Sequence, residues 1–415
     1  MTDLHGNTIG GERVPARSGG TFEVVAARRR PGEIPRSIGR YARSGAADVE
    51  AALLASRQAE DAWWELGSAG RSEILVRAAR DLSRDPDPGG RLALRLGVSE
   101  GELSSHLQDL PERLGRALED PAASSLDPRI RERGLLVLAP AWAELVSGPA
   151  SALFAALALG RTVLVVTDPV APTIGDSFAV ALARAGLPDG VLGVLHDDGL
   201  DALRAALGSA VPTFVLASGF PERVRRLERM TPRPGVTRFG AGVSDDPGLA
   251  VDLRILGSRS AAVAGDADLA RRAAEIAESA FGRARTLSGQ LPGQVGRVSI
   301  HPRVFSRFTE ELLAVLRGSA DLERPVPVVD EESQVELRRA RVLGHDEGAT
   351  LIFGGRAPEA PVSGNGNEAS PDDQDDAILA PSVFTNVEQR MRLASLARPS
   401  SLLCLLRGDG EPKKS

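Results

Sequence analysis

The chain has 415 residues, of which 42% are hydrophobic, and a formal net charge of −6 at pH 7. This length is enough for two or three domains, and the acidic balance argues against a nucleic-acid partner. The single cysteine, Cys404, excludes a disulfide framework and a cysteine-based metal site. The sequence has no apolar leader and no apolar run of membrane-spanning length, so we expect a cytoplasmic protein without a bound metal.

Arginine supplies almost all of the positive charge. Only Lys413 and Lys414 are lysines, so 50 − 2 = 48 of the Lys and Arg residues are arginines. A guanidinium stays protonated and does not act as an amine nucleophile. The sequence therefore predicts a folded body without Schiff-base chemistry and without a lysine general base.

The first part of the chain combines a strand with two helices. Residues 21–26 predict the strand, and Ala46–Trp64 and Arg71–Ser83 place apolar residues at helical spacing. We expect Trp63 and Trp64, at the end of the first helix, to pack in the core.

From Gly134 onward, apolar strands alternate with helices. Continuous runs of Val and Leu are typical of parallel strands that are buried on both faces. The expected strands are Leu135–Leu138, Thr162–Val166, Val191–Leu195 and Pro212–Leu216, and the expected helices are Pro149–Leu159, Ile174–Ala185, Leu200–Leu207 and Pro221–Arg229. This alternation predicts an α/β fold with a doubly wound, Rossmann-like sheet.

A second α/β block follows a linker, residues 231–248, that is rich in Pro, Gly and Asp. The expected elements are strands at Ser260–Ala264, Val298–Ile300, Ala349–Phe353 and Ser401–Leu406, and helices that start at Asp268, Arg303 and Glu331. Residues 359–377 are acidic and of low complexity, which predicts a mobile loop. We therefore expect a first α/β domain (residues 1–235), a second α/β domain (residues 236–407) and a polar tail (residues 408–415).

The stretch Phe281–Ile300, FGRARTLSGQLPGQVGRVSI, lies between two predicted helices and contains two Gly-Gln pairs. Glycine allows the backbone to approach a ligand closely or to adopt positive φ. This stretch is therefore the predicted active-site loop.

Several colinear segments resemble the aldehyde dehydrogenase superfamily: SGGTFEVVA, ALALGRTVLVVTDPVAPT, GDADLARRAAEIAESAFG and APSVFTNVEQRMRLA. The resemblance covers nearly the whole chain and implies a Rossmann-type cofactor domain, an α/β catalytic domain and NAD or NADP as the cofactor. The family continues beyond the match at Arg392–Leu406, so a shortened chain without the family's oligomerisation strand is implied. We therefore expect the edge near Ser401–Leu406 to need cover.

The residues at the family's catalytic positions differ from the family pattern. The nucleophilic cysteine of Gly-Gln-x-Cys falls on Ser288 or Pro292, depending on the side from which the loop is counted, and neither is a thiol. The oxyanion-binding asparagine corresponds to Ala143. The general-base glutamate corresponds to Ile255, or to Arg254 with a shift of one residue.

The cofactor positions are altered in part. The ribose-binding lysine corresponds to Val166, and the glutamate that contacts the other ribose corresponds to Ala397. The remaining candidates for cofactor contacts are Trp142, Ser218, Gly219 and Glu222. The helix that follows Gly219 can attract an anion through its free N–H groups, and the alternative is an ordinary strand–helix turn.

Two functional hypotheses follow. The first is a non-catalytic pseudoenzyme of the aldehyde dehydrogenase fold with a binding or scaffold role. The second is an NAD(P)-dependent oxidoreductase that acts on the aldehyde or oxo group of a small molecule. A small molecule in the interdomain cleft, near Glu222, Arg283 and Arg285, is a further expectation, as is a protein partner or homo-oligomer; nucleic acid and membranes are not expected partners.

Overall fold

The computed structural model describes most of the chain, in two compact units. The described residues are 4–27, 34–121, 133–230, 237–238, 250–256, 258–282, 291–319, 326–327, 329, 331–354, 378–379, 382–395 and 402–408. Unit 1 comprises residues 1–26, 36–95 and 99–255, and unit 2 comprises residues 27–35, 96–98 and 256–415.

The boundary between the units differs from the predicted one. The main division falls after Ile255, whereas the sequence placed it after residue 235. The physical reason is strand pairing: Ala250–Ile255 pairs in parallel with Phe214–Gly219, so this segment completes the sheet of unit 1. Most of the predicted linker, residues 231–236 and 239–248, lies outside the described residues.

An eight-stranded sheet forms the centre of unit 1, with the spatial order β10-β11-β9-β6-β7-β8-β2-β3. Six of its strands are mutually parallel: β6 (Leu135–Ala139), β7 (Thr162–Thr167), β8 (Leu192–His196), β9 (Pro212–Gly219), β10 (Thr237–Arg238) and β11 (Ala250–Ile255). The apolar runs of β6, β7 and β8 are buried throughout. The sheet therefore has the doubly wound form that the sequence predicted.

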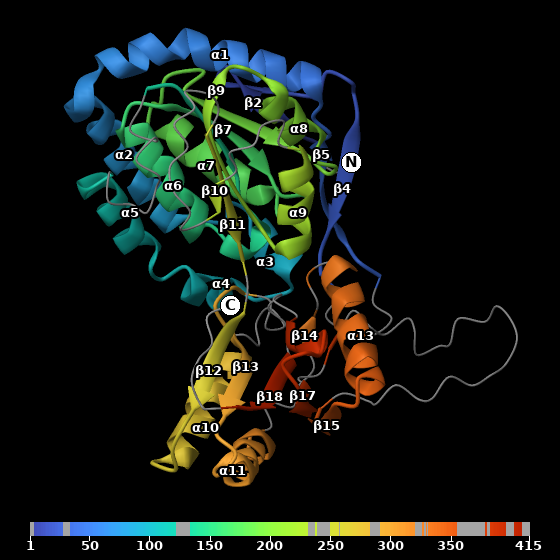
Figure 1. Cartoon of the computed structure of the whole chain (residues 1–415). Helices are drawn as coiled ribbons and strands as arrows, with labels where there is room; N and C mark the ends of the chain where they lie inside the picture. The colour runs from blue at the N-terminus through green and yellow to red at the C-terminus, as the bar shows by residue number, and fades with distance from the viewer. Residues whose placement is uncertain are drawn as a thin grey trace, which may run out of the picture. The chain divides into compact units, whose positions relative to one another are not determined.

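Helices cover both faces of this sheet (Figure 1). On one face, α1 (Ala46–Glu65) and α8 (Asp201–Gly208) pack against each other, and they share a core cluster with side chains of α9 (Pro221–Met230). On the other face, α2 (Gly67–Arg84) and α6 (Ser147–Ala158) pack together with α5 (Leu110–Glu119) and α7 (Thr173–Arg184). The chain thus leaves β6 and β9 toward opposite faces.

The remaining elements of unit 1, like α5, β10 and β11, were not predicted from the sequence, apart from β4. They are the short helices α3 (Arg91–Leu96) and α4 (Glu100–His106), a three-stranded sheet of β1 (Leu4–His5), β5 (Ser37–Ala42) and β4 (Thr21–Val25), and the hairpin of β2 (Asn7–Ile9) and β3 (Glu12–Val14). Strands of two or three residues are too short to carry a periodic pattern. The hairpin extends the main sheet, because β2 pairs antiparallel with β8.

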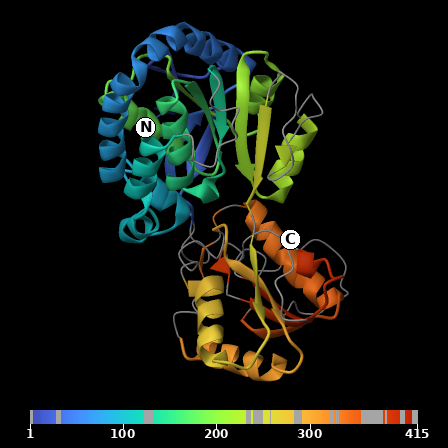
Figure 2. The same cartoon turned by 60° about the vertical axis from the view of Figure 1, so that its left-hand side comes forward.

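Unit 2 contains a five-stranded sheet of order β12-β13-β18-β17-β15 (Figure 2). Its strands are β12 (Arg259–Val263), β13 (Val295–Ile300), β15 (Thr350–Phe353), β17 (Ser382–Val387) and β18 (Leu402–Arg407), and its helices are α10 (Leu269–Ala277), α11 (Phe305–Arg317) and α13 (Glu331–Asp346). A separate two-stranded ribbon pairs β14 (Val326–Pro327) with β16 (Ile378–Leu379).

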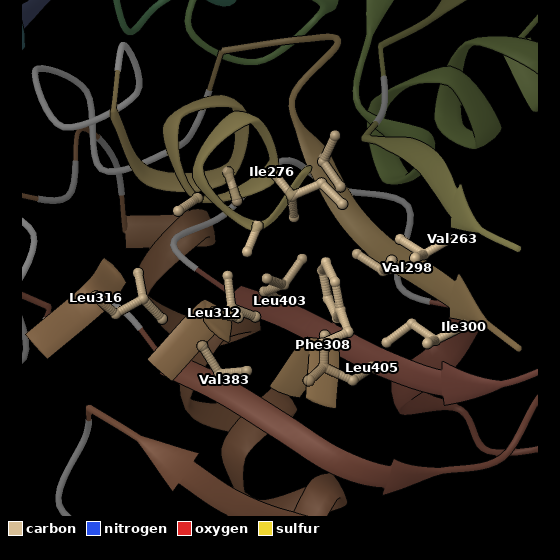
Figure 3. Close-up of a cluster of buried hydrophobic side chains, with 14 of the residues drawn as sticks. Val263, Ile276, Val298, Ile300, Phe308, Leu312, Leu316, Val383, Leu403 and Leu405 are labelled. Carbon is tan, nitrogen blue, oxygen red and sulfur yellow. The ribbon is translucent and has the colours of Figure 1, made fainter. Parts of the chain in front are cut away.

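Alternate residues of the central strands face two different cores of unit 2. Leu403 and Leu405 of β18 join Ile276 of α10 and Phe308 of α11 in one buried cluster (Figure 3). Cys404, between them, lies in a second cluster with Ala340 of α13. This period of two follows from the pleat of the strand, and it places α10 with α11 on one face and α13 on the other.

Two sequence expectations about individual positions were wrong. Residues 402–407 do not form an edge, because β18 pairs with β13 on one side and with β17 on the other. Trp63 is fully buried as predicted, but Trp64 is 42% exposed and lies under the guanidinium groups of Arg71 and Arg133. The expectation of a mobile loop at 359–377 concerns residues outside the described part of the chain.

Candidate functional site

The site lies at the carboxyl ends of β6 and β9, within unit 1. In an open parallel sheet, a crevice forms where two neighbouring strands send the chain to opposite faces, and ligands bind there. Strands β6 and β9 are such neighbours, since α6 and α9 lie on opposite faces. The residues after Ala139 and Gly219 therefore line the topological switch point.

Ser218 joins the two strand ends. Its hydroxyl accepts a hydrogen bond from the N–H of Ala141 at 2.8 Å and donates one to the carboxyl of Glu144. Ser218 is 3% exposed. Because its hydroxyl accepts one hydrogen bond and donates another, Ser218 connects the end of β9 to the segment after β6.

Glu144 ends a short 3-10 helix, Trp142–Glu144. Burial raises the pKa of its carboxyl, and the hydrogen bond from Ser218 and the positive charge of Arg254 oppose part of this rise. The next residue, Leu145, has φ 52°, a strained conformation for a bulky side chain. The turn after Trp142 thus holds a partly buried carboxyl group within hydrogen-bonding distance of Ser218 at the end of β9.

A second polar contact crosses the same crevice. The guanidinium of Arg223, in the first turn of α9, forms an ion pair with the Oδ2 of Asp168, which follows β7. The backbone N–H of Trp142 donates to the same oxygen at 3.2 Å, and the backbone N–H of Val170 donates to Oδ1 at 2.9 Å. Both carboxylate oxygens of Asp168 are therefore satisfied by the chain itself.

These residues do not fit a dinucleotide cofactor. A diphosphate at a strand–helix turn needs close backbone approach and free N–H groups. Here the Arg223 side chain lies against the turn, since a Cβ built at Gly219 would lie 2.8 Å from its Cδ. The ribose-lysine position, Val166, is apolar and 2% exposed in β7. Two carboxyl groups, Glu144 and Asp168, would face an anionic ligand.

The structure brings together three of the predicted cofactor residues. Trp142, Ser218 and Gly219 all lie at the switch point, and the Trp142 ring packs edge-on against Phe220 at 6.1 Å between centroids. Glu222, in the first turn of α9, accepts a hydrogen bond from Arg225 at 2.7 Å. Glu144, Asp168 and Arg223 were not predicted, although a polar residue directly after a buried parallel strand, such as Asp168, is a recognisable signal.

Two of the predicted catalytic positions lie next to this crevice. Ala143 is 3% exposed in the 3-10 helix, and its methyl side chain offers no donor for an oxyanion. Ile255 is the last residue of β11, in register with Gly219. Neither position carries a group that can take or donate a proton.

Residues of the predicted active-site loop are described only in part. Ser288, Arg283 and Arg285 lie outside the described residues, as does Ala397. Pro292 is described and precedes Gly293, which has φ +83° in the turn that leads into β13. Proline has no backbone N–H, so this position cannot supply the amide of an oxyanion site.

The only thiol of the sequence is inaccessible. Cys404 lies in β18 and is 1% exposed, and burial raises its pKa to about 12. A nucleophilic cysteine needs an accessible thiolate. Cys404 is therefore a core residue of unit 2.

The described ranges contain neither a cluster of metal ligands nor a membrane-spanning helix. Within those ranges, no group of three or more His, Cys, Asp or Glu residues is placed to hold a metal ion. No helix in the described part of the chain combines the length and apolarity needed to cross a membrane.

Known proteins of similar sequence are aldehyde dehydrogenases. The chain is 26% identical over 414 residues to an alpha-ketoglutarate semialdehyde dehydrogenase of Haloferax volcanii, and the match covers 95% of this chain and 79% of that protein. It is also 26% identical over 434 residues to a vanillin dehydrogenase of Pseudomonas fluorescens, covering 97% and 80% of the two chains.

Solved structures of similar fold carry the same family name. The NAD-dependent aldehyde dehydrogenase of Sinorhizobium meliloti matches with a TM-score of 0.78 at 20% identity, covering 98% of this chain and 78% of that one. An indole-3-acetaldehyde dehydrogenase in complex with NAD+ matches with a TM-score of 0.76 at 20% identity, covering 99% and 80%. The sequence profile of the aldehyde dehydrogenase family matches residues 134–396, from β6 into the last part of unit 2. This chain belongs to the aldehyde dehydrogenase family.

Proposed function

We propose that this chain is a non-catalytic member of its family, with a binding or scaffold role in place of aldehyde oxidation. The observation that carries the proposal is the thiol: the sequence has one cysteine, Cys404, and it is buried in a β-strand with a raised pKa. Loss of a catalytic nucleophile alone can lower a rate by about a millionfold.

Two further substitutions support the proposal. Ala143 stands at the oxyanion position, and the loss of one such donor costs about 3 kcal/mol of transition-state stabilisation. Ile255 stands at the general-base position, so no carboxylate there activates water for hydrolysis of an acyl intermediate. Both units nevertheless retain extensive buried cores, which supports a role that requires the folded shape.

The test is aldehyde oxidation by the purified full chain. Aliphatic semialdehydes and aromatic aldehydes are supplied with NAD+ or NADP+, and reduced cofactor is measured by absorbance. The vanillin dehydrogenase of Pseudomonas fluorescens serves as the active control. We expect no rate above that of buffer, because the chain has no accessible thiol to attack the aldehyde, and this attack must precede hydride transfer to the supplied cofactor.

The alternative is a working NAD(P)-dependent oxidoreductase with a reassigned nucleophile. Aldehyde-dependent reduction of the cofactor above the buffer rate would contradict the proposal. If that rate were lost in Ser288→Ala, the serine would be the reassigned group, since its hydroxyl is the one removed.

A further inference from the structure

We infer that Asp168 is a built-in anion that occupies the switch-point crevice and excludes a diphosphate ligand from it. The groups that would attract an anion there, the Arg223 guanidinium and the Trp142 N–H, both already contact the Oδ2 of Asp168. This inference concerns ligand binding, whereas the proposed function concerns catalysis, so each can fail separately.

The first step is the burial of the pair. The side chains of Asp168 and Arg223 are 8% and 14% exposed, so the ion pair is largely desolvated. Breaking such a pair by removing one partner leaves the other charge buried and uncompensated. A diphosphate that entered the crevice would have to displace the Asp168 carboxylate from Arg223. The free energy of leaving that carboxylate buried without its partner would weaken the binding of the diphosphate.

The second step is geometric. Arg223 starts from α9 after β9, and Asp168 follows β7, so the pair spans the end of β6, which lies between these strands. The Ala141–Ser218–Glu144 hydrogen bonds join the end of β9 to the segment that follows β6. The crevice is therefore crossed by two independent sets of side-chain contacts.

The third step is the unused capacity of the guanidinium. The Nε of Arg223 is buried and has no hydrogen-bond partner among the residues that the structure describes. A guanidinium binds phosphate through two parallel N–H donors, and here the carboxylate engages only one side of the fork. If the Asp168 charge is removed, Arg223 and the Trp142 N–H become an anion site.

The experiment compares binding of ADP and of NAD+ to the full chain by isothermal titration calorimetry. We expect no saturable binding by the wild type up to about 1 mM ligand. Asp168→Asn preserves the shape of the side chain and an acceptor for the Val170 N–H, and we expect it to bind ADP at least about tenfold more tightly than the wild type. The double variant Asp168→Asn/Arg223→Met should lose this gain.

The matched control is Asp198→Asn. Asp198 forms an ion pair with Arg43 at 2.7 Å, so this change removes the same charge from an Asp–Arg pair at another place in unit 1. An equal gain in the control would overturn the inference, as would ADP binding by the wild type at the affinity of Asp168→Asn. A folded Asp168→Asn that gains no affinity would also overturn it; Asp168→Ser repeats the test if the asparagine variant does not fold. Binding of NAD+ without oxidation would refute the inference alone and leave the proposed function intact.

Discussion

Four basic side chains of unit 1 converge on Asp176. It is 1% exposed, and its carboxylate contacts His5 at 3.2 Å, Arg13 at 3.2 Å and Arg91 at 3.3 Å. His196, at the end of β8, places its Nε2 3.8 Å from the same carboxylate. A single side chain of α7 thereby joins β1 and α3 to two strands of the central sheet, β3 and β8.

The stability of unit 1 is expected to fall as the pH drops from 6.5 to about 4. Burial, offset in part by Asp176, lowers the pKa of His196 from 6.5 to about 4. In this window the unfolded imidazole binds a proton that the folded one does not, so the stabilisation is fully present above pH 6.5 and is lost progressively below it. The loss amounts to about 3 kcal/mol. Urea unfolding at several pH values, followed by tryptophan fluorescence, measures it.

The control for this prediction is His196→Gln, which removes the titrating group. The variant should be less stable than the wild type at pH 7, but its free energy of unfolding should change less between pH 6.5 and 4. Equal pH slopes in the two proteins would contradict the assignment to His196.

Single residues of the site were predictable to different degrees. Trp142 follows β6, and Ser218 and Gly219 end β9, so the strand pattern predicts their place at the switch point, while a cofactor contact by them stays a prediction. Arg223 and Asp168 were missed because their contact joins residues 55 positions apart and depends on β6 lying between β7 and β9. Sequence periodicity assigns strands but does not give their spatial order.

At the scale of single elements, α1 depends on an anchor at its first turn. Asp48 is 1% exposed, and its carboxylate accepts hydrogen bonds from the N–H groups of Gly45 and Arg17, each at 2.9 Å. Asp48→Ala leaves both donors without this partner and should lower the free energy of unfolding of unit 1 by about 2 kcal/mol. Urea titration at pH 7 measures this change. Glu50→Ala, an exposed position in the same helix, should stay within about 0.5 kcal/mol of the wild type; similar losses in both variants would contradict the anchor.

Elements were predicted well where the hydrophobic pattern was strong. The predicted strand at 401–406 corresponds to β18, but its place in the sheet was predicted wrongly. The family resemblance implied that this strand lies at the edge of its sheet. In the structure, Ser382–Val387, a strand that was not predicted, pairs with it in parallel. The alternation of Leu403, Cys404 and Leu405 between two cores explains why the run is apolar throughout.

At the scale of the whole molecule, the two units have separate hydrophobic cores, and tryptophan fluorescence distinguishes one unit from the other. All three tryptophans, Trp63, Trp64 and Trp142, lie in unit 1. Tryptophan fluorescence therefore reports on unit 1 alone, while far-ultraviolet circular dichroism reports on the helices of both units. Domains with their own cores can unfold as separate cooperative units.

We expect a core substitution in unit 2 to leave the fluorescence transition of unit 1 unchanged. Phe308 is fully buried between α11 and the sheet of unit 2, and Phe308→Ala should cost about 3–5 kcal/mol there, because it removes a large apolar side chain and leaves a cavity. The urea midpoint of the dichroism signal should fall in this variant while the fluorescence midpoint stays fixed. Phe154→Ala, at a fully buried position of α6 in unit 1, should lower the fluorescence midpoint instead. If Phe308→Ala shifted both midpoints equally, the two units would unfold in one cooperative transition. That result would contradict the expectation that each unit is stable on its own.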